Sequence, residues 1–462
     1  MSPALDRWFE LTARRSTVGA EARGGVTTFM VMAYIIFVNP AILSFAGVPG
    51  LEGKGAPFAA AQAATCLAAA VFTIAMGLAT NYPLALASGM GLNAVVAFQL
   101  IAGLGLSWPA AMGVVFLEGL VITVLVLTGF REAVMNAIPM SLKQAISVGI
   151  GLFILFIGLV SAGIVKPGPP GVPVVLGDLT APSVAVVGLL LTLWLQARGV
   201  AGGLLIGILA ATGLAIVVNG VAGGKAFPLP GQAVLPARWI AMPDLSALGA
   251  GVNVDVFVQV GALTAIVTIF SLMLTDFFDT MGTVVGIGGE AGWLTRDGRL
   301  PRLDRVLLVD SLAAAGGGAA GASSVTTYIE SAAGVSAGAR TGLASVVTGV
   351  CFLLALFFSP LAAVVPAQAT APALVIVGYV MARVVREIPL ADIEDGFPAL
   401  LAMTVMPFSY SITNGIGAGF VTYGFIKLVR GKGAQVHPMM WVAVVAFVVY
   451  FAMPGLKRLL GA

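Results

Sequence analysis

The sequence has few charged residues and almost no cysteine or histidine. Only 9% of its 462 residues are Asp, Glu, Lys or Arg, whereas about 25% is usual for a soluble domain. Its two cysteines, Cys66 and Cys351, lie in apolar runs without a C-x-x-C pair, so we predict small core residues rather than a disulfide framework or a metal site. The single histidine, His437, is predicted to lie in a polar connection.

Long basic tracts and nucleotide-binding motifs are also missing. The net charge is only +3, and the bases lie scattered in short loops, so nucleic acid is not expected as a partner. There is no Walker motif, glycine-rich nucleotide loop or Ser/His/Asp set. ATP-driven transport by this chain alone and membrane-enzyme chemistry are therefore disfavoured.

Apolar residues dominate what is present. The chain is 59% hydrophobic with a mean hydropathy of +1.05, and stretches near the roughly 20 residues needed to cross a bilayer recur along it. We predict an integral membrane protein. Residues 1–24 lack the features of a signal peptide. Leu5, Trp8, Phe9 and Leu11 share one helical face there, which predicts a short interfacial helix on the cytoplasmic side.

Fourteen apolar segments are expected, seven on either side of a polar, extracytoplasmic connection at 223–256. The first seven form a repeat over 25–222 and the second seven a repeat over 257–430. A further apolar stretch at 439–453, in a C-terminal part of 431–462, either crosses as a fifteenth helix or lies along the cytoplasmic face. The segments fall at 25–46, 58–80, 84–103, 109–129, 142–163, 181–197 and 202–222, then at 257–284, 306–322, 325–338, 341–362, 367–384, 397–411 and 414–430.

The two halves resemble each other. Residues 138–155 are similar to 365–382, residues 185–213 line up loosely with 399–424, and the third segment of each half is interrupted by small residues. An odd number of crossings per half makes the second copy inverted, as in many secondary transporters. The bases agree with a cytoplasmic N-terminus. Those assigned to cytoplasmic connections are Arg131, Arg296, Arg299, Arg302, Arg305, Arg340, Arg383, Arg386, Lys427, Arg430 and Lys432.

The interrupted third segments carry polar residues at a depth where lipid would not solvate them. "PLALASGMGLNA" leads to Asn93, and "SSVTTYIESAAGV" contains Glu330. Irregular backbone at that depth is tolerated where it lines a cavity. With the Thr326 and Thr327 hydroxyls and the Tyr328 ring, the set suits a flat heterocycle edged with N–H and C=O better than a metal ion or a lone anion. Alternatively, the Asn93 amide only satisfies a neighbouring backbone group.

Two aspartates, Asp276 and Asp279, stand three residues apart in the segment 257–284. They are predicted to point to nearly the same helical face. Buried carboxylates that close repel each other, so at least one is expected to be protonated near neutral pH and suited to carrying a proton. Alternatively, one caps a broken helix or points into a vestibule. Glu118 and Asp310 are interpreted as polar contacts between packed helices.

Five motifs in order resemble one family. "FELTARRSTVGAEARGGVTTFMVMAYIIFVNPAILSFAGVP", "NYPLALASGMGLNAVVAF", "DFFDTMGTVVG", "GRLPRLDRVLLVDS" and "TTYIESAAGVSAGARTGL" are similar to the AzgA-like purine permeases, a branch of the nucleobase:cation symporter-2 family. The resemblance covers residues 9 to 430. It implies an all-α fold of the uracil-transporter type, with a core domain (25–129 and 257–362) moving against a gate domain (142–222 and 367–430) that forms a homodimer.

The resemblance also implies a function and a site. It implies proton-coupled uptake of adenine, guanine or hypoxanthine across the cell membrane by an elevator-like movement, with no cofactor besides the co-transported proton. A uracil or xanthine permease, and then an anion transporter of this architecture, are the alternatives. Thr283 replaces the uracil branch's histidine. The predicted substrate contacts are Met90, Asn93, Asp276, Asp279, Thr327, Tyr328, Ile329 and Glu330, and the predicted proton carriers are Asp276, Asp279 and Glu330.

Overall fold

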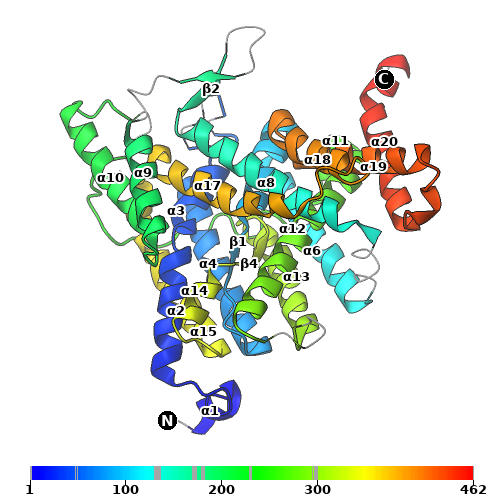
Figure 1. Cartoon of the computed structure of the whole chain (residues 1–462). Helices are drawn as coiled ribbons and strands as arrows, with labels where there is room; N and C mark the ends of the chain where they lie inside the picture. The colour runs from blue at the N-terminus through cyan, green and yellow to red at the C-terminus, as the bar shows by residue number, and fades with distance from the viewer. Residues whose placement is uncertain are drawn as a thin grey trace.

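The computed structural model describes residues 3–46, 48, 50–51, 53–129, 137–168, 174–177, 183–227, 232–293, 295 and 300–460. Within these ranges the chain is mostly helical, and eight helices are long and apolar enough to cross a membrane. The polytopic membrane class predicted from hydropathy is therefore confirmed. The all-α part of that prediction is incomplete, because two short two-stranded sheets are present (Figure 1).

A first group of helices combines both halves of the sequence and occupies mainly the lower part of Figure 1. In this first helix group α4 packs on α15 and α13, α13 packs on α6, and α2 packs on α15. Small residues allow the close approach of α4 and α15, since a Cβ added at Gly342 would lie 2.0 Å from the Gly77 carbonyl oxygen. The members are α2 (Val18–Met32), α3 (Ile35–Leu43), α4 (Phe58–Thr80), α6 (Trp108–Leu127), α12 (Ala262–Glu290), α13 (Leu303–Ala320) and α15 (Gly342–Ala355).

A second helix group extends across the upper part of Figure 1, from α9 and α10 on the left to α18 and α19 on the right. In it α8 packs on α17 and α18, α18 packs on α19, and α9 packs on α10 and α17. Gly151 and Gly378 let α8 and α17 touch, because a Cβ on either would fall within 2.7 Å of the other's carbonyl oxygen. The members are α8 (Met140–Ser161), α9 (Ser183–Ala197), α10 (Gly203–Val221), α17 (Ala367–Ala382), α18 (Gly396–Ser409) and α19 (Ile412–Val429).

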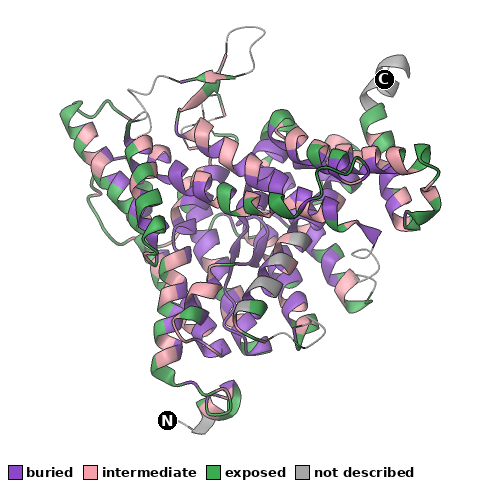
Figure 2. Ribbon diagram, in the orientation of Figure 1, coloured by how far each residue is buried: buried purple, intermediate pink, exposed green. Residues whose placement is uncertain are grey.

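Shorter elements complete the chain. Strands β1 (Leu86–Ser88) and β4 (Val325–Thr327) pair inside the first helix group, and β2 (Val165–Pro167) pairs with β3 (Val174–Leu176) beside α8 of the second group. Figure 2 shows that buried residues concentrate where the two helix groups meet. The remaining elements are α1 (Pro3–Phe9), α5 (Met90–Ala94), the π-helix η1 (Val95–Gly103), α11 (Val256–Val260), α14 (Ser331–Ser336), η2 (Leu356–Phe358), α16 (Ser359–Ala363), η3 (Arg383–Glu387), η4 (Gly433–Gln435) and α20 (Pro438–Leu460).

Most predicted segments agree with helices to within a few residues, but some ends differ. The first predicted segment begins at Val18 rather than at residue 25, because the Thr17 side chain caps the helix by accepting from the Ala20 N–H. The eighth continues to Glu290. The stretch 439–453 lies in α20, which packs on α19 and α12. Three bases used in the predicted topology, Arg131, Arg296 and Arg299, lie outside the described residues.

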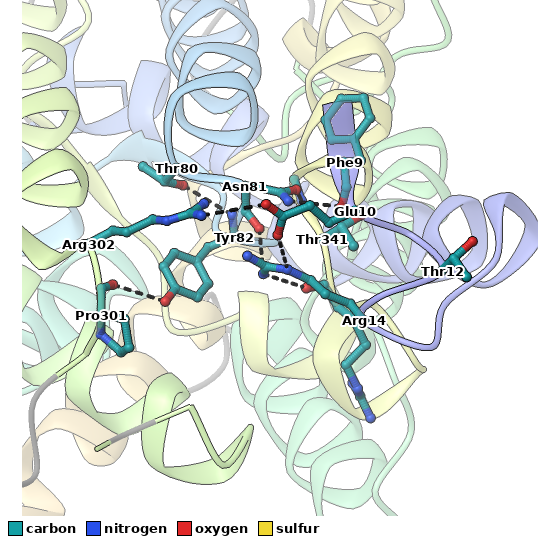
Figure 3. Close-up of polar contacts among 12 residues, drawn as sticks. Phe9, Glu10, Thr12, Arg14, Thr80, Asn81, Tyr82, Pro301, Arg302 and Thr341 are labelled. Carbon is teal, nitrogen blue, oxygen red and sulfur yellow. Dashed lines mark hydrogen bonds and ion pairs between the residues drawn. The ribbon is translucent and has the colours of Figure 1, made fainter. Parts of the chain in front are cut away.

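The N-terminal segment packs onto one end of the first helix group (Figure 3). The Asn81 side-chain amide donates to the Phe9 carbonyl across 2.9 Å, and Arg14 donates to the Asn81 carbonyl across 2.9 Å. Arg302 forms an ion pair with Glu10 at 3.6 Å. Only part of the predicted interfacial face is free, because Phe9 is buried whereas Trp8 is 62% exposed.

Candidate functional site

The centre of the candidate site is the antiparallel pair of strands β1 and β4. Leu86 lies opposite Thr327 and Ser88 opposite Val325, and both strands are buried. Each strand has only three residues, so residues just outside the strands form the hydrogen bonds at the two ends of the pair. The Gly89 N–H donates to the Ser324 carbonyl across 2.9 Å, and the Tyr328 N–H donates to the Ala85 carbonyl across 2.9 Å. The two interrupted segments predicted from sequence thus satisfy each other's backbone.

A helix follows each strand, and the turn between them presents the polar residues. On the first side α5 begins at Met90 after Gly89, and on the second α14 begins at Ser331 after Glu330. Glu330 is half-buried, and its carboxylate accepts a hydrogen bond of 2.7 Å from the Tyr34 hydroxyl. Tyr34 stands at the turn between α2 and α3 and is 1% exposed. Its hydroxyl therefore holds the Glu330 carboxylate in one orientation.

A cavity of about 310 Å³ opens beside Glu330. Its volume lies in the range of roughly 300 to 1,000 Å³ seen for small-molecule sites. The first helix group and the β1–β4 region supply its polar wall, and α9, α10 and α17 of the second helix group supply a mostly apolar wall. The lining includes Tyr34, Met90, Asp279, Tyr328, Ile329 and Glu330.

Five of the predicted substrate contacts line this cavity and three do not. The residues that line it are Met90, Asp279, Tyr328, Ile329 and Glu330. Asn93 is fully buried one helical turn further along, and its side-chain amide donates to the Ser88 carbonyl across 3.4 Å. Thr327 is also buried, and its hydroxyl donates to Asp310. Asp276, the third, is buried and is not among the described residues that line the cavity.

The two aspartates of α12 have different surroundings. Three residues along an α-helix leave side chains about 60° apart, which is enough here to separate them. Asp279 lines the cavity, whereas Asp276 is 1% exposed and lies near Glu118 on α6, a helix that packs on α12. The two aspartates thus lie on neighbouring faces of α12, as expected, but of the two only Asp279 lines the described cavity.

Asp310 on α13 ties these elements together. One carboxylate oxygen accepts from the Thr327 N–H at 2.9 Å and from the Thr327 hydroxyl at 2.8 Å. The other accepts from the Thr280 hydroxyl at 2.6 Å, and Thr280 is in turn 2.6 Å from the Thr326 hydroxyl. Asp310 therefore fixes β4 against α12, which agrees with its predicted role as a polar contact between helices.

Sequence reasoning missed Tyr34 and the apolar wall. Tyr34 is in an ordinary apolar run, "FMVMAYIIFV", and its polar role depends on Glu330, which is 296 positions away. A tyrosine in the middle of a predicted spanning segment was the available signal, since its hydroxyl needs a partner there. The α17 residues that line the cavity, including Ile376 and Val380, are apolar, so no polar residue in the sequence indicated that α17 forms part of the site.

Comparison with known proteins places this chain in a protein family. The Permease family profile (Xan_ur_permease) matches residues 19–456. The guanine/hypoxanthine permease PbuG of Bacillus subtilis (strain 168) is 41% identical over 459 residues, covering 97% of this chain and 99% of PbuG. The adenine permease AdeQ of Escherichia coli (strain K12) is 37% identical over 435 residues, covering 93% of this chain and 92% of AdeQ.

Solved structures show the same fold at low sequence identity. The transmembrane domain of a cyanobacterium bicarbonate transporter, BicA, has a TM-score of 0.62 at 14% identity, covering 86% of this chain and 97% of that domain. The murine Slc26a9 anion transporter in the inward-facing state has a TM-score of 0.61 at 10% identity, covering 89% of this chain and 68% of that protein. At such identities the likeness concerns the fold alone.

The class of protein follows from these observations. A multi-pass helical chain with a polar cavity between two helix groups, and with relatives that are permeases, is a membrane transporter rather than an enzyme. The chain belongs to the Permease family, in its AzgA-like branch of the nucleobase:cation symporter-2 proteins, as the five sequence motifs predicted.

Proposed function

We propose that this protein takes purine nucleobases (adenine, guanine and hypoxanthine) into the cell by proton-coupled symport. The observation that carries the proposal is the cavity of about 310 Å³ lined by Asp279, Glu330 and the Tyr328 ring. Carboxylates accept hydrogen bonds from ring N–H groups, and an aromatic ring packs against a flat heterocycle. Relatives named as guanine/hypoxanthine and adenine permeases support the purine class.

Within the cavity Glu330 accepts an N–H of the neutral purine, and Tyr34 holds the carboxylate for that contact. Ile329 and Met90 pack against the ring, and Asp279 accepts a second N–H or an exocyclic amine. Asn93 and Thr327 do not contact the purine. They stabilise the segments next to the cavity, Asn93 by its hydrogen bond to the Ser88 carbonyl and Thr327 by its hydrogen bond to Asp310. The co-transported proton resides on a buried carboxyl, with Asp276, Asp279 and Glu330 as the candidates and no other cofactor.

An anion transporter of the same architecture is the less favoured function. An anion in the cavity would call for a fixed positive charge, as a buried ion needs a partner. No lysine or arginine is among the described residues that line this cavity, and two carboxylates are. The similarity to anion transporters in solved structures concerns the fold alone.

The helix contacts support the proposed inverted repeat of seven and seven segments. The second segment of the first half (α4) packs on the fourth of the second half (α15), and the fourth of the first (α6) packs on the second of the second (α13). The third segments pair through β1 and β4, and the fifth pair through α8 and α17. Such exchange of partners is what a pseudo-two-fold axis between inverted repeats produces.

The same contacts support the proposed core and gate domains. The first helix group corresponds to the core (25–129 and 257–362) and the second to the gate (142–222 and 367–430), with the cavity between them. In the proposed elevator movement, the core carries the bound purine past the gate, and the gate forms the homodimer.

The polar contacts of the N-terminus support the proposed cytoplasmic orientation in the cell membrane. Glu10 pairs with Arg302, and Arg14 donates to the Asn81 carbonyl (Figure 3). Arg14 also donates to the Arg340 carbonyl. The N-terminal segment and the connections bearing Arg302 and Arg340 therefore lie at one end of the molecule. These are connections that the positive-inside rule assigns to the cytoplasm.

The test is uptake of tritiated adenine, guanine, hypoxanthine and uracil into proteoliposomes with and without an inward proton gradient. Purine uptake that the gradient stimulates, with uracil excluded, is the expected result. Uptake of uracil in preference to purines would replace the proposed substrate class. Purine uptake that is indifferent to the gradient would leave the substrate class and remove proton coupling.

A further inference from the structure

Two carboxyl groups meet in the interior of the first helix group, away from the cavity. Glu118 stands in the middle of α6 and Asp276 in the middle of α12, and they are 0% and 1% exposed. Neither residue lines the described cavity that holds Asp279 and Glu330. The pair is therefore shielded both from water and from direct contact with a bound purine.

Each member of this pair has an oxygen atom without a described hydrogen-bond donor. Glu118 Oε1 and Asp276 Oδ1 receive no hydrogen bond from any described N–H or hydroxyl group. The two carboxyl groups lie on packed helices, close enough to interact with each other. Ionised carboxylates can only accept, so a hydrogen bond between them would require that one group be protonated. The Ser324 hydroxyl donates to the other Glu118 oxygen, Oε2, across 3.5 Å.

The charged neighbours of the pair among the described residues are acidic. Asp310 on α13 faces both members, and Asp279 on α12 acts on Asp276. Ion pairs among the described residues involve only Glu10 and Glu394, so neither Glu118 nor Asp276 has a described lysine or arginine as counter-ion. With no described lysine or arginine paired to either group, binding of a proton would relieve this repulsion.

Hydrogen bonds of Asp310 connect the helix of Asp276 to the strand that precedes Glu330. Thr280 follows Asp276 by one helical turn and donates to Asp310 across 2.6 Å. Asp310 accepts from the N–H and the hydroxyl of Thr327 in β4. Glu330 follows Thr327 by three residues and lines the cavity. A change in the charge of the pair, or in the distance between its two carboxyl groups, is therefore expected to affect the position of β4 and of Glu330, which is proposed to contact the substrate.

We infer that Glu118 and Asp276 form a shared-proton site that carries the coupled proton, and that Asp279 serves the substrate instead. The inference rests on the proposed proton-coupled transport and divides its roles between two places. The proton is held at the carboxyl pair between α6 and α12, and the purine is held at Glu330 and Asp279. Glu118 is then a coupling residue that never touches the purine.

Glu118→Gln separates this site from a structural contact. The glutamine amide donates permanently to Asp276, so the variant imitates the protonated pair. We expect purine binding and purine exchange between equal internal and external pools to persist. We expect net accumulation driven by a proton gradient to be lost. One coupled proton sustains about tenfold accumulation per unit of pH gradient, so the ratio should fall from about tenfold to about one.

The pH dependence of purine binding gives a second readout. In the wild type, affinity should weaken as rising pH removes the shared proton. In Glu118→Gln it should stay flat over the same range, and Glu118→Asp should restore the slope. The control is Glu21→Gln, another fully buried carboxylate, which accepts from the Arg340 and Thr341 N–H groups far from α12. We expect this variant to lose thermal stability and keep full coupling.

Gradient-driven accumulation by Glu118→Gln at the wild-type ratio would overturn the inference while leaving proton-coupled purine transport intact. Absence of gradient-driven uptake in the wild type would instead overturn the proposed function. Infrared difference spectroscopy of the wild type on purine binding does not depend on any variant folding. A carboxylic acid C=O band that responds to purine and shifts in ²H₂O supports the shared proton, and absence of any such band contradicts it.

Discussion

Tyr34 donates its hydroxyl proton to the carboxylate of Glu330 across 2.7 Å, between segments 296 positions apart in the chain. Tyr34 is almost completely buried, and Glu330 is half-buried on the wall of the cavity. The contact links the turn after α2 to the turn before α14. It thus joins the first and second halves of the chain at the point where the substrate is proposed to bind.

Removal of the Tyr34 hydroxyl should weaken purine binding without abolishing it. Tyr34→Phe keeps the ring packing and leaves Glu330 free to rotate. A hydrogen bond of this kind contributes on the order of 1 kcal/mol, or roughly fivefold in affinity. The Kd for hypoxanthine, measured on purified protein, checks this. Tyr379→Phe is the control, since that side chain is 60% exposed, and an equal loss in both variants would contradict the role of Tyr34.

Glu330→Gln should have a larger effect than Tyr34→Phe. The amide replaces one acceptor oxygen with a donor that repels a purine N–H, and a hydrogen bond to a charged group contributes about 1.5 to 3 kcal/mol. We expect affinity to fall about tenfold to a hundredfold. Binding of tritiated guanine measures it. Glu387→Gln in η3, at an exposed position, is the control. Unchanged binding by Glu330→Gln would remove the centre of the proposed site.

Substitution of Asn81 should reduce stability in two ways, through its backbone conformation and through its side-chain hydrogen bonds. It ends α4 in the left-handed region with φ 57°, and its side chain bonds the Phe9 carbonyl and the Gly342 N–H, each at 2.9 Å. Asn81→Ala loses both hydrogen bonds and strains the backbone, which together cost about 2 to 4 kcal/mol. Asn81→Gly relieves the strain and should lose less. Thermal unfolding in detergent measures both, and equal losses would mean that the conformation is unimportant.

Gly342→Ala should destabilise the first helix group. The added methyl would lie 2.0 Å from the Gly77 carbonyl oxygen, and this is a backbone atom that cannot rotate away. Overpacking of this kind costs about 1 to 3 kcal/mol. Gly213→Ala in α10 is the matched control, because nothing lies within 4 Å of its added Cβ. We expect the melting temperature to fall only for Gly342→Ala, and a fall in both would point to helix propensity instead.

Glu394 should stabilise the protein in a pH-dependent way. It pairs with Lys427 at 2.6 Å, Arg430 at 2.6 Å and Lys432 at 2.5 Å in a connection outside the spanning helices. These cations, through their hydrogen bonds, lower the pKa of Glu394 from 4.5 to about 2. The contribution is therefore complete above pH 4.5 and disappears as pH falls towards 2.

The check is the melting temperature of the wild type and of Glu394→Gln across that pH range. The difference between them should be largest near neutral pH and should shrink as the solution becomes acidic. High salt should also reduce it, because Arg430 and Lys432 are exposed and solvent ions screen their charges. A difference that stays constant with both pH and salt would mean that Glu394 acts through packing.

Much of the helical framework was predictable because lipid imposes a length and a composition on each segment. The bounds of α4 were predicted to the residue, 58–80. Glu330 and Asp279 were predictable as site residues, because burying a carboxylate within the membrane costs free energy unless it faces a cavity or has a partner. The separation of Asp279 from Asp276 was not predictable. A spacing of three residues fixes their relative angle but not which neighbour, cavity or Glu118, faces each one.

The sequence by itself determined the membrane class, the order of the segments and the two interrupted stretches, because these depend on local hydropathy and on small polar residues. Only the tertiary structure decided that Tyr34 orients Glu330, that α17 closes the cavity, and that Glu118 meets Asp276. Each of these contacts joins residues far apart in the chain. Their existence depends on how the two helix groups pack, and no local pattern records that packing.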